Sequence, residues 1–196
     1  MNTLSRRLLL AAAAVLLLPV ATAAQQALRS QLQTIPDSLL TYLTRNDMLD
    51  LIDYRDSGIN AEVSNRLGGR SRLTTLTDSV AVFELNEACR MSVVMLATDG
   101  GNDTPGDAVF CVVRTFGTVC RASEISFFDA DWRQLPPERF IALPSCPVEI
   151  AVSPSNVGQL TVTVTHVSDE RADNEQENHA DVLTTFKWDE KIFKKI

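Results

Sequence analysis

The sequence predicts an α+β fold in which an N-terminal helical pair packs on an antiparallel meander sheet of about seven to nine strands. Apolar residues recur at helical spacing from Gln25 to about Asp56, and from Asn60 onward they alternate with a period of two. Turn residues then follow one another at intervals of about 8 to 12 positions. Helices followed by strands, rather than alternating with them, favour α+β over a parallel α/β sheet.

The first 24 residues have the pattern of a secretory signal peptide. The pair Arg6-Arg7 is followed by the apolar run Leu8–Val20 and by the small residues Ala21-Thr22-Ala23. The run is shorter than the roughly 20 apolar residues that a membrane-spanning helix needs. We therefore expect an exported protein, in the periplasm or outside the cell, whose residues 25–196 form a single globular domain without membrane insertion.

The helical region contains signals for two short helices or one kinked pair. Pro36 suits the first turn of a helix, because its ring fixes φ at a helical value and its missing N–H is not needed there. Asn46 or Asp47 suits the N-cap of a second helical segment. Gly58 ends the region.

Eight segments between turn residues are candidate strands. They are Ala61–Leu67, Ser71–Leu76, Ser79–Leu85, Met91–Ala97, Asp107–Arg114, Thr118–Phe128, Gln159–Val167 and Asp181–Trp188. Val148–Ser153 is a further candidate strand, one helical turn is expected near Phe140, and Lys187–Lys195 is typical of a closing strand with a charged edge. Short connections predict a meander, with the helices on one face and the other face either solvated or a binding surface.

Four cysteines follow the leader, and an even number in an exported chain is compatible with disulfides: Cys89, Cys111, Cys120 and Cys146. Cys111 and Cys120 flank a turn around Thr115–Gly117. A two-residue loop would place them opposite each other as a disulfide pair, whereas a bulged three-residue loop would place them on different faces. The sequence leaves a structural disulfide and four buried free thiols as alternatives, and it contains no Cys-x-x-Cys redox or zinc motif.

Charge and motif content argue against several function classes. The net charge of −7 becomes more negative once Arg6-Arg7 is removed, which disfavours nucleic acid and anionic lipid as partners. The two histidines, His166 and His179, belong to no zinc-binding or His-Glu-x-x-His pattern. The acidic stretches Asp99–Asp107 and Asp169–Glu175 lack the order of a calcium loop. We expect no metal and no cofactor.

Short motifs spread over most of the mature chain resemble the bacterial family called domain of unknown function 3256. They include Ile35–Leu40, Asn65–Ser71, Cys111–Thr115, Ser123–Phe128 and Asp131-Trp132. The resemblance implies an exported protein of Gram-negative bacteria without an established activity, and it supplies no functional residues. Members often carry two cysteines near the central hairpin turn. Here Phe116 occupies the place of the first, which weakens any disulfide carried over to that turn.

The function expected from these observations is a non-enzymatic binding module for a protein or cell-envelope ligand. The candidate binding residues lie in loops beside predicted strands and are Trp132, Arg133, Asp99, Asn102 and Asp103. The alternative is a small cell-envelope hydrolase with a carboxylate pair such as Asp129 and Asp131. The hydrolase predicts a concave cleft with a carboxylate of raised pKa, whereas the binding module predicts an exposed apolar or aromatic patch.

Overall fold

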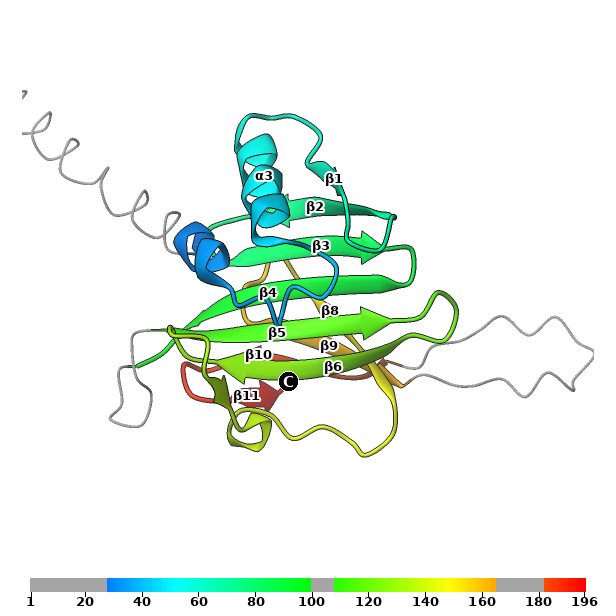
Figure 1. Ribbon diagram of the computed structural model, residues 1–196. Coiled ribbons are helices and arrows are strands. Elements are labelled where there is room, and N and C mark those ends of the chain that lie inside the picture. Colours follow the sequence, from blue (N-terminus) through cyan, green and yellow to red (C-terminus); the bar gives the residue numbers. More distant parts are fainter. Residues whose placement is uncertain (1–27, 100–107, 165–181) are drawn as a thin grey trace, which may run out of the picture.

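The structure, a computed structural model, describes residues 28–99, 108–164 and 182–196. These residues form three layers: a short helical layer, a large antiparallel sheet and a smaller antiparallel sheet behind it (Figure 1). The predicted signal peptide, Asn102, Asp103 and both histidines lie outside the described residues. Within the described part of the chain, no helix is long and apolar enough to span a membrane.

The helical layer consists of residues 28–34 and of α3 (Arg45–Asp56). The Thr44 side chain caps α3 by accepting a hydrogen bond from the Asp47 N–H at 3.1 Å, and the Asp47 carboxylate accepts one from the Thr44 N–H at 2.6 Å. The predicted N-cap at Asn46 or Asp47 was therefore wrong by two or three positions. Pro36 lies after the first helix and not in its first turn, whereas Gly58, with φ of 70°, does follow the end of α3.

The large sheet, here called sheet A, has seven strands whose spatial order equals their chain order, which confirms the predicted meander. Its strands are β1 (Glu62–Ser64), β2 (Arg70–Leu76), β3 (Val80–Asn86), β4 (Cys89–Ala97), β5 (Ala108–Phe116), β6 (Ala122–Phe128) and β7 (Gln134–Leu135). The helical turn expected near Phe140 is η1 (Pro137–Arg139), which follows β7.

The remaining strands form a second sheet, sheet B, with the order β11-β10-β9-β8. They are β8 (Val148–Val152), β9 (Gln159–Val164), β10 (Val182–Trp188) and β11 (Phe193–Lys195). The predicted meander of seven to nine strands therefore holds for the seven strands of sheet A, whereas the last four strands form a separate second sheet that was not predicted. The expected closing strand with a charged edge is β11, where Lys194 and Lys195 are exposed.

The central part of sheet A is buried on both faces, because alternate residues of its central strands enter two different cores. On the helical side, Val93 of β4 and Phe110 of β5 pack with Leu51 of α3. On the other side, Val94 and Cys111 belong to a cluster shared with sheet B. The face that was expected to be solvated or a binding surface is therefore covered by sheet B around Val94 and Cys111.

Hydrogen bonds and an ion pair connect the two sheets at two places, near the start of β6 and at the end of β4. The Ile150 N–H of β8 donates to the Ser123 hydroxyl of β6 at 2.9 Å, and Arg121 pairs with Glu149 at 3.4 Å. The Trp188 indole N–H of β10 donates to the Ala97 carbonyl at the end of β4 at 2.6 Å. The first contact occupies a backbone N–H of the edge strand β8, and together the three contacts fix where sheet B lies on sheet A.

The register of β5 and β6 decides the question of the disulfide. Phe116 lies opposite Ala122, so residues 117–121 form the loop between the two strands. Cys111 consequently faces Phe127 across the strands and is fully buried between the sheets, whereas Cys120 lies in the exposed loop. The Cys111–Cys120 pairing is wrong, since the loop is longer than either of the two that were considered. All four thiols are free, but Cys120 and Cys146 are exposed, so the alternative of four buried thiols is also wrong.

Candidate functional site

In the part of the chain that the structure describes, sheet B leaves one end of its face of sheet A uncovered, and this open end is the candidate functional site. The uncovered end carries the turns that join β1 to β2, β3 to β4 and β5 to β6. Side chains of five strands and these three turns surround an open hollow of about 820 Å³. The residues that line it are Glu62, Gly69, Arg70, Arg72, Glu84, Asn86, Glu87, Ala88, Cys89, Arg90, Thr115, Gly117 and Arg121.

A row of polar side chains crosses sheet A at this end, perpendicular to the strands. Each member lies directly opposite the next in the strand register, so all of them point to the same face. From β1 to β6 the row consists of Glu62, Arg72, Glu84, Arg90, Thr115 and Ser123. Ser123, the last member, is the residue that contacts β8, so the row begins in the open and ends beneath sheet B.

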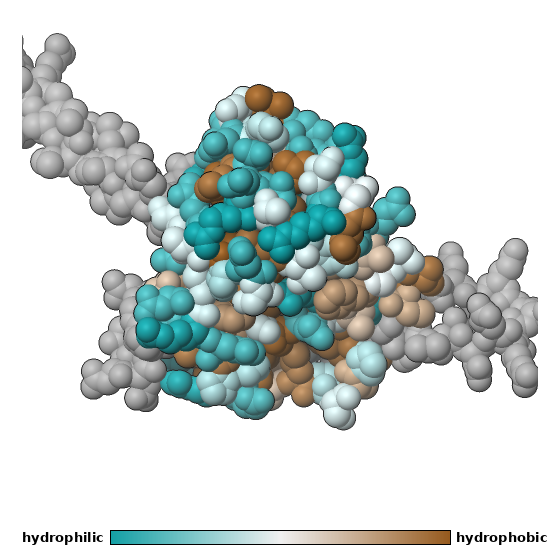
Figure 2. Space-filling model, in the orientation of Figure 1, coloured by the Kyte–Doolittle hydropathy of each residue, from teal (hydrophilic) through white to brown (hydrophobic). Residues whose placement is uncertain are grey.

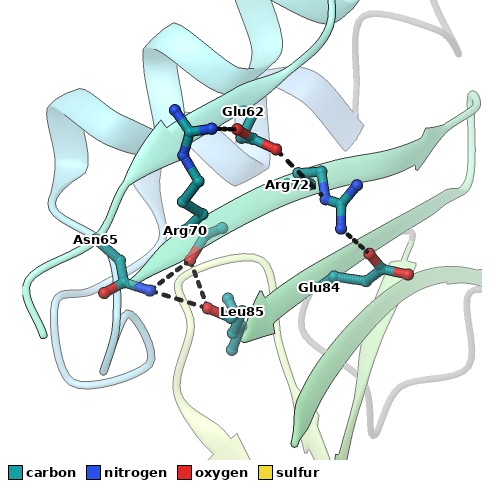
Figure 3. A network of polar contacts seen from close by, with 7 residues as sticks. Glu62, Asn65, Arg70, Arg72, Glu84 and Leu85 are labelled. Atoms are coloured by element: carbon teal, nitrogen blue, oxygen red, sulfur yellow. Dashed lines mark hydrogen bonds and ion pairs between the residues drawn. The ribbon is translucent and has the colours of Figure 1, made fainter. Parts of the chain in front are cut away.

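The first part of the row is a network of ion pairs that neutralise one another (Figure 3). Arg72 contacts Glu62 at 3.6 Å and Glu84 at 3.5 Å, so one guanidinium joins carboxylates from β1 and β3. Arg70 contacts the other oxygen of Glu62 at 2.7 Å. Two arginines and two glutamates therefore compensate each other, and the partly exposed Glu62 is shared between both arginines.

Arg90 differs from the other arginines of the hollow. It lies on β4 between Glu84 and Thr115 in the register, and its side chain is exposed. Among the described residues it makes no ion pair, whereas Arg121, at the far side of the hollow, pairs with Glu149. The Thr115 hydroxyl is engaged with that of Ser123 at 2.8 Å. The Arg90 guanidinium is thus an exposed cation at the middle of the row, and no carboxylate of the described residues pairs with it.

Asn65 fixes the β1–β2 turn on one side of the hollow. Its carbonyl oxygen accepts hydrogen bonds from the Leu67 and Gly69 N–H groups, each at 3.0 Å, and its amide donates to the Leu85 carbonyl at 3.0 Å and the Ser71 hydroxyl at 3.1 Å (Figure 3). Because Asn65 is buried and uses its acceptor twice and its donors twice, it holds the turn against β3 and keeps the hollow open.

Gly117 fixes the β5–β6 turn on the other side. Its φ is 102°, a conformation that other residues rarely adopt, and a Cβ at this position would collide with the carbonyl oxygen of Cys120. The Gly117 N–H donates to the Ala88 carbonyl at 2.8 Å, which ties this turn to the neighbouring β3–β4 turn. The three turns around the hollow are therefore held by specific hydrogen bonds, from the Asn65 side chain in one case and between Gly117 and Ala88 in the other two.

Large apolar side chains project from two of these turns and from the end of β5. Leu67 is 72% exposed, Val119 is 78% exposed and Phe116 is 39% exposed. In contrast, hydrophilic residues predominate on the surface over the helical layer, which faces the viewer in Figure 2. A polar hollow with apolar side chains on the surrounding turns is the combination that favours a binding site at this end.

The structure places the sequence-predicted binding residues elsewhere. Trp132 is 8% exposed, its ring lies 5.2 Å from that of Phe110, and its indole N–H donates to Thr34 at 3.2 Å. It is a core residue beneath the helical layer, which corrects its assignment to a binding surface. Arg133 pairs with the neighbouring Asp131 at 3.0 Å, and neither lines the hollow.

Asp99 forms an ion pair with Lys191 at 2.7 Å and is also absent from the hollow. The carboxylates suggested for a hydrolase have different roles from each other. Asp129 is buried, and one of its oxygens accepts hydrogen bonds from the Asp131 and Arg133 N–H groups, each at 2.9 Å, so it holds a turn. Asp131 is exposed. Within the described ranges, no group of three metal-ligating side chains comes together.

Sequence reasoning missed the residues of the row, although a signal for them exists. Glu84 and Arg90 each interrupt a mostly apolar strand, and Arg72 is a charged residue within the more polar strand β2. A charged residue inside a strand is a surface residue on one face, and three of them in successive strands define one exposed strip. Placing the strip required the register, which the turn lengths did not fix in advance.

The comparisons with known proteins agree with this fold. A solved domain of an uncharacterized protein from Porphyromonas gingivalis W83 superposes with a TM-score of 0.67 at 17% sequence identity, over 87% of this chain and 99% of that domain. No curated protein matches the sequence. The family model described as a protein of unknown function (DUF3256) matches residues 20–163, a range that includes every residue of the hollow. The chain belongs to the DUF3256 family.

Proposed function

We propose that this protein is an exported, non-enzymatic binding module that recognises a protein ligand at the open end of sheet A. The observation that carries the proposal is the hollow of about 820 Å³, with its charged row and with exposed Leu67 and Val119 on the turns beside it. Exposed apolar side chains next to polar groups that can pair across an interface are typical of protein-binding surfaces.

The turns around the hollow support binding because they are held in place before a ligand arrives. Asn65 bonds to four groups of its own turn and of the strands beside it, and Gly117 is joined to the β3–β4 turn through Ala88. A preformed site loses less conformational entropy on association than a site that must fold around its ligand. The apolar residues on these turns can therefore contribute to affinity rather than to ordering the loop.

Export is the second element of the proposal and rests on residues 1–24. Its test is expression of the full chain in a Gram-negative host, followed by cell fractionation and N-terminal sequencing of the product. The expected result is a protein outside the cytoplasm that begins near Gln25. A product that keeps its N-terminal methionine and stays in the cytoplasm would contradict this element.

Binding is tested by selecting peptides from a phage-displayed library of random 12-residue peptides against the purified exported protein. The expected result is a set of peptides that bind saturably and that lose affinity for a double variant, Leu67→Ser with Val119→Ser. The matched control is Val157→Ser, because Val157 is also an exposed apolar residue, at 49%, but lies in the β8–β9 turn of sheet B. Affinity should be unchanged in this control.

The selection separates the proposal from its alternatives. Peptides that bind the Leu67/Val119 double variant as well as the unchanged protein would show that binding, if present, lies away from the open end. Failure to obtain any saturable peptide would count against a protein ligand altogether. The double variant replaces exposed side chains, so a circular dichroism spectrum identical to that of the parent protein is expected and is the control for folding.

A further inference from the structure

We infer that Arg90 binds a carboxylate of the partner, so that the ligand of the open end is a peptide segment with an acidic side chain at its centre. This inference rests on the proposed function and specifies the chemistry of its ligand.

The charges of the hollow single out Arg90. Arg70 and Arg72 share Glu62 and Glu84, at distances of 2.7 to 3.6 Å, and Arg121 pairs with Glu149. These cations already have carboxylate partners within the protein. Arg90 has no such partner among the described residues, although Glu84 lies opposite it in the register, because the Glu84 carboxylate contacts Arg72. An incoming carboxylate therefore meets one guanidinium that no carboxylate of the described residues compensates.

The position of Arg90 suits it to anchor a ligand. It projects from β4, the central strand of the seven in sheet A, onto the face that sheet B leaves open. A guanidinium presents paired N–H donors in one plane, which matches the two oxygens of a carboxylate. A ligand seated in the hollow would also exclude water from this pair, and the ion pair is stronger where the surroundings are less polar.

The neighbouring residues limit what the ligand carries beside its acid. Leu67 and Val119 lie on turns at the two sides of the hollow and offer contacts to apolar side chains before and after the acidic residue. Glu87, which is exposed in the β3–β4 turn, disfavours a second carboxylate next to the first. The protein itself has a net charge of −7, which disfavours strongly acidic partners at a distance. One acid between apolar residues is the expected pattern.

Two synthetic peptide pools provide the probe. Both have the form Leu-x-x-Z-x-x-Leu, where x is any uncharged residue, and Z is glutamate in one pool and glutamine in the other. The glutamate pool should bind the exported protein about ten-fold to hundred-fold more tightly than the glutamine pool, as expected for hydrogen bonds to a charged group. Fluorescence anisotropy with labelled pools measures both dissociation constants.

Substitutions at Arg90 then test whether this residue is responsible. Arg90→Gln should remove the preference for glutamate, Arg90→Lys should keep part of it, and Arg90→Glu should shift the preference to a third pool with lysine at Z. The control is Arg133→Gln, because Arg133 is an exposed arginine outside the hollow. Its preference for glutamate should equal that of the unchanged protein.

The outcomes distinguish the inference from the function on which it rests. If the glutamate and glutamine pools bind equally well, or if Arg90→Gln leaves the preference intact, the carboxylate assignment is overturned while the binding module stands. If phage selection yields binders without an acidic residue, the assignment is overturned in the same way. If the pools do not bind and phage selection yields no peptide that binds saturably, both the assignment and the proposed function fail.

Discussion

The two ends of one face of sheet A are built from the same strands and have opposite characters. At the covered end, Val94, Cys111 and Phe127 lie side by side across β4, β5 and β6 and are buried beneath sheet B. At the open end, on the same face, Arg90 and Thr115 belong to the polar row that lines the hollow. The comparison shows that each crosswise row of side chains, rather than each strand, determines what covers the sheet.

The physical reason lies in the cost of burial. Covering an apolar row contributes about 25 cal/mol for each Å² of apolar surface removed from water. Covering the charged row would remove ionised groups such as Arg90 from water, and the attraction within ion pairs often fails to repay that loss. Sheet B therefore leaves the charged part of the row uncovered within the described residues, and it meets the row at Ser123, whose hydroxyl accepts a backbone hydrogen bond from Ile150.

The largest contrast is expected in thiol reactivity, between Cys120 in the loop at the open end and Cys111 beneath sheet B. In the reduced native protein, Cys120 and Cys146 should react with Ellman's reagent within seconds to minutes, because both are exposed. Cys111 and Cys89 should react only when the protein unfolds, since burial raises the pKa of both thiols and excludes the reagent.

The control for this experiment is a variant with Cys120→Ser and Cys146→Ser. It should show no fast reaction under native conditions and two reactive thiols in denaturant. A fast reaction of Cys111 in this variant would mean that sheet B opens readily and that the covered end is not stably packed, whereas a reaction of Cys89, which lies in the core on the helical side, would not bear on sheet B.

A core substitution at the covered end should lower the free energy of unfolding much more than a matched substitution at the open end. Phe127 is fully buried, with its ring 4.7 Å from that of Phe140 and 6.2 Å from that of Phe193. Phe127→Ala should lower the free energy of unfolding by about 3–5 kcal/mol. Urea denaturation measures the change.

Phe116→Ala is the matched control, because Phe116 belongs to β5 at the open end and is 39% exposed. Its loss should cost less than about 1 kcal/mol. Equal losses at Phe127 and Phe116 would contradict the distinction between a covered and an open end.

Two glycines test whether the open end is held by its turns instead of by a covering layer. Gly68 and Gly117 both have positive φ, of 79° and 102°, but a Cβ would meet nothing within 4 Å at Gly68 and would collide with a backbone carbonyl at Gly117. Gly68→Ala should cost about 1 kcal/mol of stability and Gly117→Ala more than about 2 kcal/mol. Similar values at both positions would show that the β5–β6 turn adjusts freely. The free energies come from urea denaturation.

The smallest effect is expected within the charged row itself. Arg72→Gln removes contacts of 3.5 and 3.6 Å to two carboxylates, but Arg72 is 54% exposed, so the loss of stability should be about 0–1 kcal/mol. The loss should shrink further at about 1 M salt, where the Debye length is about 3 Å. A loss above about 2 kcal/mol would show that the row stabilises the fold and would weaken its assignment to ligand binding.

Several features of the fold followed from local patterns in the sequence. The change of period near Asn60 separated helices from strands, and the strand segments between the turn residues match β2 to β5 closely. The charged C-terminal segment indicated the edge strand β11. The family resemblance was confirmed by the match over residues 20–163. These features depend on residues that are near one another in the chain.

The covering of sheet A was harder to predict, although its central strands contained a hint. Val93-Val94 and Val109–Val113 are apolar at consecutive positions, which is typical of strands buried on both faces. The pattern shows that something covers each face but does not say what. The segments that provide the cover, β8 to β11, are far away in the sequence and alternate like any half-buried strand.

The sequence by itself determined the types of the elements, their order and the family to which the chain belongs, because hydrophobic period and turn chemistry act within a few residues. Only the tertiary structure decided that β8 to β11 form a second sheet, that Trp132 is buried, that Cys111 is far from the surface, and that Arg90 stands in a charged row. These outcomes depend on strand register and on which apolar faces meet. Both depend on contacts between segments that are distant in the sequence, and a local sequence pattern does not predict the energies of such contacts.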